Sequence, residues 1–216
     1  MKRLTILRLD NKVYTWLQII LLFVLPVILL LFDVVPYDAH LLFGGIILCL
    51  IVGIVLKERW TLSDLGLQLR FKREAWLVHI AVTIVGVGVI VFLARMLHLP
   101  SADISAQGFY HFNPIFLIAL NFAQEFLYRV FLIRKLELVL SRMTLVVIAN
   151  AFIFAFMHLI FTPPWFMFGV TLIMGAVYAI LYIRYRSWIL VGLSHTVLNA
   201  LAIYLCFVRD VPGCAS

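Results

Sequence analysis

Five polar side chains interrupt three apolar segments, each of which is long enough to cross a membrane. Glu125 and Arg129 lie in the first segment, His158 in the second, and His195 and Asn199 in the third. Ionisable groups are costly in hydrocarbon, so their presence there indicates a functional site. A carboxylate and two imidazoles can relay protons or bind a metal ion. We therefore expect the three segments to pack around one catalytic or binding centre inside the bilayer.

The spacing within each segment places the polar groups on one face of a helix. Glu125 and Arg129 are four residues apart, so they lie one turn apart and can pair directly. His195 and Asn199 have the same spacing. With a rise of about 1.5 Å per residue, Glu125 lies roughly 14 Å, His195 roughly 12 Å and His158 roughly 22 Å from the inner end of its helix. Helix tilt accommodates this spread, so the three segments can meet within the membrane.

Three other interpretations of these residues remain open. Glu125 and Arg129 would also serve as a structural ion pair within the bundle. Glu125, His158 and His195 have the ligand types of a zinc site, although the chain contains no HExxH motif. The same three residues suit a proton relay in a small transporter, but neither inverted halves nor paired discontinuous helices are evident. We rank chemistry without a metal or other cofactor first. The other histidines lie near predicted segment ends, and we expect no catalytic role for them: His40, His79, His98 and His111.

The composition identifies the elements that must position these groups. The chain is 65% hydrophobic with a mean hydropathy of +1.14, whereas ordinary globular chains are about 45–50% apolar. Segments of about 20 apolar residues are long enough to span a bilayer. The sequence therefore predicts an all-α, polytopic membrane helix bundle, with a single domain over residues 1–216 and a motif-bearing core at about 113–205. The seven predicted spans are 14–32, 39–56, 75–97, 114–135, 143–161, 165–183 and 187–207.

The distribution of basic residues predicts the orientation of the spans. Lys and Arg are concentrated before the first span, in the 57–74 loop, in the 134–142 connection and at 184–186. Cytoplasmic loops are those enriched in Lys and Arg, and only Arg95 and Arg209 depart from a regular alternation. We expect a multi-pass plasma-membrane protein with a cytoplasmic N-terminus and an external C-terminus. The net charge of +7 is divided among these segments, so we do not expect nucleic-acid binding.

Local signals predict smaller features. Asn113-Pro114 is typical of a helix start, with Asn as the N-cap and Pro at the first helical position. In the 57–74 loop, apolar residues alternate with others from Leu65 to Phe71, which predicts a short extended stretch. The cysteines show neither a metal-ligand spacing nor a disulfide framework: Cys49, Cys206 and Cys214.

The polar residues fall into three short motifs that resemble those of a known family. In chain order they read Gln124-Glu125-x-x-x-Arg129, Phe154-x-x-x-His158 and His195-x-x-x-Asn199. Three such motifs, in this order on three helices, resemble the CPBP intramembrane proteases. That family includes the type II prenyl-protein (CAAX) endopeptidases and bacterial bacteriocin-processing and abortive-infection relatives. The resemblance covers about residues 113–205, and although each motif alone is weak, the ordered set is a specific signal.

The resemblance implies a role for each residue. In the family, the first of two adjacent glutamates acts with the histidine of the second motif to activate water. The histidine and asparagine of the third motif stabilise the oxyanion. Carried over to this chain, His158 would help polarise water, and Glu125 or the Gln124–Glu125 pair would act with it. His195 and Asn199 would donate to the tetrahedral intermediate, and Arg129 would hold the acidic side chain in place.

Gln124 departs from the family pattern because it occupies the position of the leading glutamate. A glutamine amide cannot act as a base, and three explanations are open. Glu125 takes over as the base, or the protein has lost proteolysis and kept a binding role, or Gln124 is an introduced change that traps an inactive enzyme. We expect a bacterial intramembrane endopeptidase that hydrolyses a membrane-associated peptide or protein, with a prenyl group suggested by the family alone. The alternative is a catalytically silent binding, immunity or regulatory protein on the same scaffold.

Overall fold

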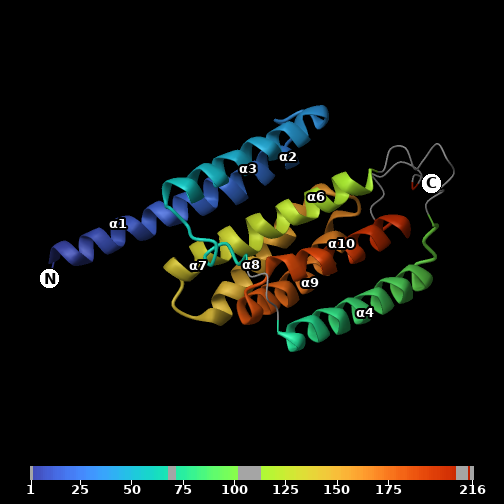
Figure 1. The fold of residues 1–216 in the computed structure, drawn as a ribbon. Coiled ribbons are helices and arrows are strands. Elements are labelled where there is room, and N and C mark those ends of the chain that lie inside the picture. The colour runs from blue at the N-terminus through green and yellow to red at the C-terminus, as the bar shows by residue number, and fades with distance from the viewer. Residues whose placement is uncertain (1, 68–71, 102–112, 208–213, 215–216) are drawn as a thin grey trace.

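The computed structural model describes residues 2–67, 72–101, 113–207 and 214, which form helices and turns without a strand. The predicted all-α membrane bundle is confirmed, and Figure 1 shows its helices running along a common direction. The elements are α1 (Lys2–Ile19), the π-helix η1 (Ile20–Val24), α2 (Leu25–Leu31), the 3-10 helix η2 (Tyr37–Ala39), α3 (His40–Lys57), α4 (Arg73–Met96), α6 (Pro114–Glu125), the π-helix η3 (Phe126–Leu132), α7 (Ile133–Val139), α8 (Met143–Met157), the 3-10 helix η4 (His158–Ile160), α9 (Pro164–Tyr185) and α10 (Trp188–Tyr204).

Within the described part of the chain, six helical stretches are long and apolar enough to cross a membrane. They are Asn11–Leu31, His40–Lys57, Arg73–Met96, Pro114–Val139, Met143–Ile160 and Pro164–Tyr185. The remaining apolar helix, α10, has 17 residues and is about 25 Å long at 1.5 Å per residue. The seven predicted spans thus correspond to six full-length spans and one shorter helix, and the shorter one carries the third motif.

Capping residues fix where the motif-bearing helices begin. The Asn113 side chain accepts hydrogen bonds from the backbone N–H groups of Ile115 at 2.9 Å and Phe116 at 3.2 Å. Because Pro114 occupies the first helical position, the predicted start of this span is confirmed. Ser187 caps α10 in the same way. The two caps set the register of the helices that carry Glu125 and His195.

The centre of the bundle is the helix pair α6–η3 and α10. Helix α10 packs against α6 on one side and α4 on the other, and α8 packs along α9 (Figure 1). In the most apolar 18-residue stretch of Pro114–Val139, 44% is buried inside the bundle. In the corresponding stretches of α3 and α4, the buried share is only 11%. Helices α3 and α4 therefore present mostly apolar side chains to the lipid, whereas α6–η3 is enclosed by other helices.

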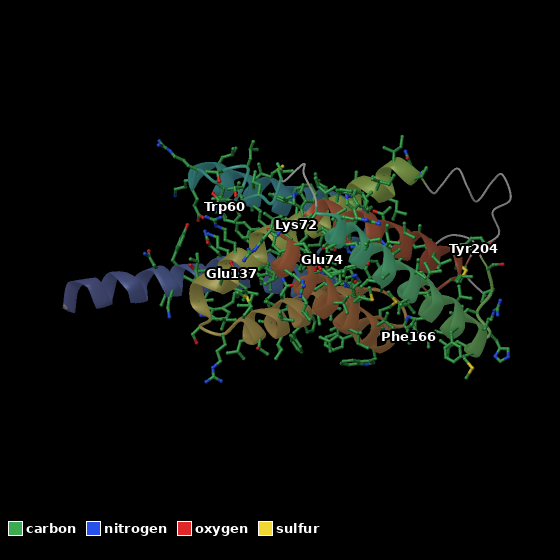
Figure 2. All side chains as sticks on the ribbon, turned by 60° about the horizontal axis from the view of Figure 1, so that its bottom comes forward. Trp60, Lys72, Glu74, Glu137, Phe166 and Tyr204 are labelled. Carbon is green, nitrogen blue, oxygen red and sulfur yellow. A yellow bond between two sulfur atoms is a disulfide. The ribbon has the colours of Figure 1, made fainter. Side chains whose placement is uncertain are left out.

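Four ion pairs join the helix ends on one side of the bundle. They are Asp64–Arg134 at 2.5 Å, Glu58–Lys135 at 2.5 Å, Glu137–Arg186 at 2.7 Å and Glu74–Arg184 at 2.9 Å. In Figure 2, Trp60, Glu74 and Glu137 lie toward this end, and Phe166 and Tyr204 lie toward the other. The charged end is the one that the distribution of Lys and Arg assigns to the cytoplasm.

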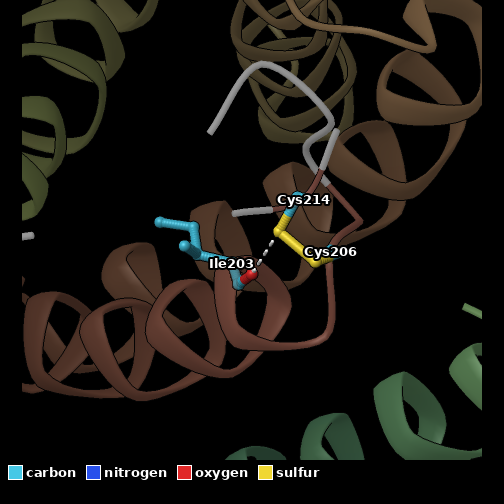
Figure 3. The surroundings of a disulfide bond; sticks show 3 residues. All are labelled: Ile203, Cys206 and Cys214. Carbon is cyan, nitrogen blue, oxygen red and sulfur yellow. Dashed lines mark hydrogen bonds between the residues drawn. A yellow bond between two sulfur atoms is a disulfide. The ribbon is translucent and has the colours of Figure 1, made fainter. Parts of the chain in front are cut away.

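Two local predictions need correction. Cys206 and Cys214 form a disulfide with a Cα–Cα distance of 5.2 Å (Figure 3), so the prediction of no disulfide was wrong. A separation of eight residues has no characteristic motif, and this pair is recognised only from its position in space. The expected extended stretch was also wrong at Leu65 and Gly66, which lie in turns, and its residues 68–71 lie outside the described part of the chain.

Candidate active site

Glu125 lies at the centre of the site and uses both carboxylate oxygens. Its side chain is fully buried, Oε2 accepts a hydrogen bond from Arg129 Nε at 2.9 Å, and Oε1 lies 2.7 Å from His195 Nδ1. An ionised carboxylate only accepts hydrogen bonds, so His195 must donate through Nδ1. The contact therefore fixes the tautomer of His195 and leaves Nε2 of its neutral form with a free lone pair. The predicted meeting of the first and third motifs is present in the structure.

Arg129 is held by a partner that the sequence analysis missed. Its Nη1 donates to Asn150 Oδ1, and its guanidinium lies 4.6 Å from the centre of the Phe154 ring. Asn150 also donates to the backbone oxygen of Tyr128 at 2.7 Å. Asn150 is fully buried and lies eight residues before His158, on the same face of α8. This repeat of the four-residue spacing, Asn150 to Phe154 to His158, is the signal that would have identified it.

His158 ends α8, and its ring is oriented by the helix backbone. Its Nδ1 lies 2.8 Å from the carbonyl oxygen of Phe154, which can only accept, so the neutral ring has its lone pair on Nε2. The Phe154 ring contacts both imidazoles, with ring centres 4.6 Å from His158 and 5.9 Å from His195. One aromatic side chain thus packs against the two histidines that line the cavity.

Asn199 is oriented by a second residue that the sequence analysis missed. Its Nδ2 donates to Asn121 Oδ1 at 2.7 Å. Asn121 is fully buried on α6, one turn before Glu125, and its own Nδ2 has no hydrogen-bond partner among the described residues. An amide nitrogen carries two hydrogens, so Asn199 retains one for another acceptor. Asn121, Glu125 and Arg129 form a polar stripe with a period of four, which was the available signal.

An apolar cavity of about 450 Å³ joins the second and third motifs. His158, His195 and Asn199 line it together, and most of its wall is aliphatic or aromatic. The apolar wall comes from α4, α9 and the end of α10, and includes Val82, Val85, Val89, Met174 and Leu198. Glu125 and Arg129 do not line the cavity, because they lie behind His195. A ligand in this cavity would therefore meet two imidazoles and an amide, but not the carboxylate.

A chain of hydroxyl groups links three helices beside His195. Thr83 Oγ1 lies 2.7 Å from Ser194 Oγ, which lies 3.2 Å from the Tyr178 hydroxyl. The Tyr178 ring is 5.7 Å from the His195 ring. These hydroxyls hydrogen-bond to one another, and they hold α4 and α9 against α10 at the level of His195.

Gln124 is not among the residues that line the cavity. Its Nε2 lies 3.9 Å from the sulfur of Met157, a weak contact. Met157 directly precedes His158, so the side chain at position 124 extends toward the helix end that carries the second motif. Because its amide is neutral at every accessible pH, Gln124 contributes no net charge to the site.

Glu125, His158 and His195 were also considered as ligands of a zinc ion. Within the described ranges, no group of three His, Cys, Asp or Glu side chains is placed to hold a metal ion. Both oxygens of the Glu125 carboxylate are already hydrogen-bonded, one to Arg129 and one to His195.

Comparison with known proteins agrees with the motifs. Residues 106–201 match a family model described as Rce1-like, type II CAAX prenyl endopeptidase. The match contains all three motifs and confirms the resemblance recognised from them. No curated protein and no solved structure matches the chain.

Proposed function

We propose that this multi-pass membrane protein is an intramembrane endopeptidase. Its residues 106–201 match the Rce1-like family of type II CAAX prenyl endopeptidases. One observation carries the proposal. His158, His195 and Asn199 line one apolar cavity, while Glu125 holds His195 from behind. Two imidazoles and an amide facing a water-poor space form a group that can activate water and bind an oxyanion.

In the proposed reaction, His195 is the base. Its Nε2 takes a proton from the attacking water, and the Glu125 carboxylate on Nδ1 stabilises the resulting imidazolium. The water oxygen bonds to the peptide carbon, and the remaining Nδ2 hydrogen of Asn199 donates to the oxyanion. His158 accepts a hydrogen bond from the same water through Nε2 and orients it. The proton on His195 then passes to the leaving amine as the C–N bond breaks.

This scheme gives Glu125 a different role from that of a base acting directly on water. Both of its oxygens are engaged, and it does not reach the cavity, so it acts through His195 rather than on water. The missing glutamate at position 124 is then less damaging than the motif alone suggests.

The cavity wall favours a substrate with an apolar part. A membrane-associated peptide or protein would place its scissile bond near His195 and an apolar chain along α4 and α9. A prenyl group is the suggestion of the family description. We further propose a plasma-membrane location with the end of α10 outside. The Cys206–Cys214 disulfide at that end supports this orientation, since disulfides persist in oxidising compartments.

The test is cleavage of a peptide library, with and without prenyl groups, by the purified protein in lipid. We expect cleavage by the unaltered chain and a loss of about 10²-fold or more in His195→Ala. His79→Ala is the matched control, since His79 is also buried but bonds to its own helix at Ala75 and does not line the cavity. Full activity in a variant that lacks both His158 and His195 would overturn the proposal.

A second candidate, a silent binding protein, is favoured by Gln124. It predicts that the unaltered chain binds the peptide but does not cleave it, and that Gln124→Glu alone introduces cleavage. If instead the unaltered chain cleaves and Glu125→Gln abolishes turnover, the protein is an active protease and this candidate is excluded.

A further inference from the structure

Two stacked aromatic rings form one end of the cavity. Phe166, at the start of α9, and Phe207, just after α10, have ring centres 5.6 Å apart and planes at 15°. Both rings line the cavity that His158, His195 and Asn199 line, and Phe207 is only 6% exposed. The α9 start and the α10 end lie on the side of the bundle opposite the four ion pairs (Figure 2). The rings thus form the wall between the polar groups and that surface.

Phe207 is held by a covalent constraint. Its backbone N–H donates to the carbonyl oxygen of Ala202 at 3.0 Å. The same turn contains Cys206, whose φ of 53° is in the left-handed region. Cys206 is disulfide-bonded to Cys214, and Cys214 Sγ lies 3.6 Å from the carbonyl oxygen of Ile203 (Figure 3). Cys206 and Cys214 are 2% and 4% exposed. A left-handed residue other than glycine is unfavourable, so the surrounding contacts must maintain this turn.

The cavity is longer than a single side-chain pocket. On α4 its wall extends from Ala81 to Leu93, a length of about 18 Å at 1.5 Å per residue. At its inner part lie Tyr178 and His195, and at its outer end lie Phe166 and Phe207. An apolar chain that extends outward from His195 therefore meets these two rings before it reaches the end of the helices.

We propose that Phe207 is a specificity-determining residue that sets the length of the apolar chain the cavity accepts, and that the Cys206–Cys214 disulfide holds it in that position. The proposal takes from the proposed function only that an apolar substrate occupies the cavity; it does not require cleavage. Phe166 supports Phe207 by stacking but belongs to α9, whose start is fixed by Pro164. Phe207 is therefore the ring whose position depends on the disulfide.

The test uses photoreactive peptides that carry apolar chains of increasing length, added to the purified protein in lipid. Labelling is measured by mass spectrometry, which requires binding but no turnover. We expect Phe207→Ala to shift the preferred length to longer chains and to raise their labelling relative to short ones by about tenfold, as expected for added space in an apolar pocket. Phe207→Trp should shift the preference to shorter chains.

Phe152→Ala is the matched control. Phe152 also belongs to an aromatic pair, with Phe168 at 5.6 Å, but it is 53% exposed and does not line the cavity. Its replacement should leave the length preference unchanged. An identical preference in wild type, Phe207→Ala and Phe207→Trp would overturn the proposal, as would the absence of labelling at every length. Labelling with the expected shift but no cleavage would support the proposal and count against the proposed endopeptidase.

A second arm tests the disulfide. The double variant Cys206→Ser/Cys214→Ser should accept longer chains than wild type, in the same direction as Phe207→Ala but with a smaller shift. Treatment of wild type with a reductant should reproduce this change and have no effect on the double variant, which still contains the exposed Cys49. An unchanged length preference in the double variant would overturn the role given to the disulfide.

Discussion

Ion pairs occur in two regions of this molecule, and their surroundings differ. At the polar centre, the side chains of Glu125 and Arg129 are 0% exposed. At the charged end of the bundle, those of Glu74 and Arg184 are 57% and 66% exposed. The residue types and N–O distances are alike, at 2.9 Å in both pairs. Only the inner pair has exchanged all of its contacts with water for contacts with protein.

The difference shows what each region can do. Removal of one member of a buried pair leaves an uncompensated charge, so the two groups are stable only together. This requirement fixes Glu125 between Arg129 and His195 and thereby orients His195. An exposed pair can exchange its partner for water at little cost, so it anchors helix ends without directing any one atom. The following predictions compare the two regions, beginning with the largest expected effect.

Replacement of Arg129 should give the largest loss of stability. Arg129→Met leaves the Glu125 carboxylate buried without its cation, and we expect a loss of about 3–5 kcal/mol in the free energy of unfolding. Unfolding in mixed detergent micelles measures this change. Arg184→Met, at the exposed pair, is the matched control and should leave the unfolding midpoint nearly unchanged.

A double variant, Glu125→Met/Arg129→Met, sharpens the same comparison. Because two apolar side chains replace a buried pair at little cost, it should recover much of the stability lost in Arg129→Met. Cleavage should be lost, since His195 no longer has the carboxylate that supports it. Equal destabilisation by the single and double variants would mean that packing, not charge, dominates at this site.

Loss of Asn150 should have the next largest effect. Asn150→Ala removes the partners of Arg129 Nη1 and of the Tyr128 carbonyl in a fully buried site. We expect a destabilisation of about 1–3 kcal/mol, measured by the same unfolding experiment. Asn113→Ala, which removes only an exposed helix cap, should cost about 1 kcal/mol. A smaller loss at Asn150 than at Asn113 would contradict the proposed importance of the buried contacts.

Lys135 provides an intermediate case. Its side chain is buried at 3% exposure, but its partner Glu58 is 33% exposed. Lys135→Met should therefore cost at most about 1 kcal/mol, because Glu58 can be rehydrated. Partial burial opposes the ionisation of Glu58, yet the hydrogen bonds from Lys135 and Trp60 bring its pKa below the ordinary value. The variant should raise that pKa, which titration followed by NMR would detect.

The smallest effect is expected for Asp64 and should depend on pH. The hydrogen bond from Arg134, followed by those from Thr61, lowers the pKa of Asp64 from 3.8 to about 2. Since the folded-state pKa is the lower one, this stabilisation is complete above pH 3.8 and is lost as the pH falls toward 2. Unfolding midpoints measured across this range should therefore decline more steeply in wild type than in Asp64→Asn. Parallel curves would show that the pair does not contribute.

The fold and the outline of the site could be predicted because they follow from local patterns. Apolar length and the alternation of basic loops indicate the spans, and the four-residue spacing places Glu125 beside Arg129 and His195 beside Asn199. These are properties of a single helix and need no knowledge of its neighbours. The cap at Asn113 is local in the same sense.

The missed features depend on how helices meet. In the sequence, only the four-residue spacing distinguishes Asn121 and Asn150 from other polar residues. In the structure, α10 brings Asn199 within hydrogen-bond distance of Asn121, and η3 brings Arg129 within hydrogen-bond distance of Asn150. The placement of Glu125 behind His195, outside the cavity, likewise follows from packing rather than spacing. The disulfide could be recognised only once the structure placed Cys214 beside Cys206. Each of these contacts joins residues far apart on different elements or, for the disulfide, residues without a diagnostic motif.

The π-helix η3 has an angular consequence for the polar stripe on this span. An α-helix has 3.6 residues per turn, so the four-residue step from Asn121 to Glu125 overshoots a full rotation. The next step, from Glu125 to Arg129, runs through η3, where wider turns make four residues fall short of a full rotation. The two deviations have opposite sign, and the three side chains stay nearly in line along the helix axis instead of winding around it. Deletion of one residue within 126–128 would restore α-helical winding and rotate the guanidinium away from Asn150.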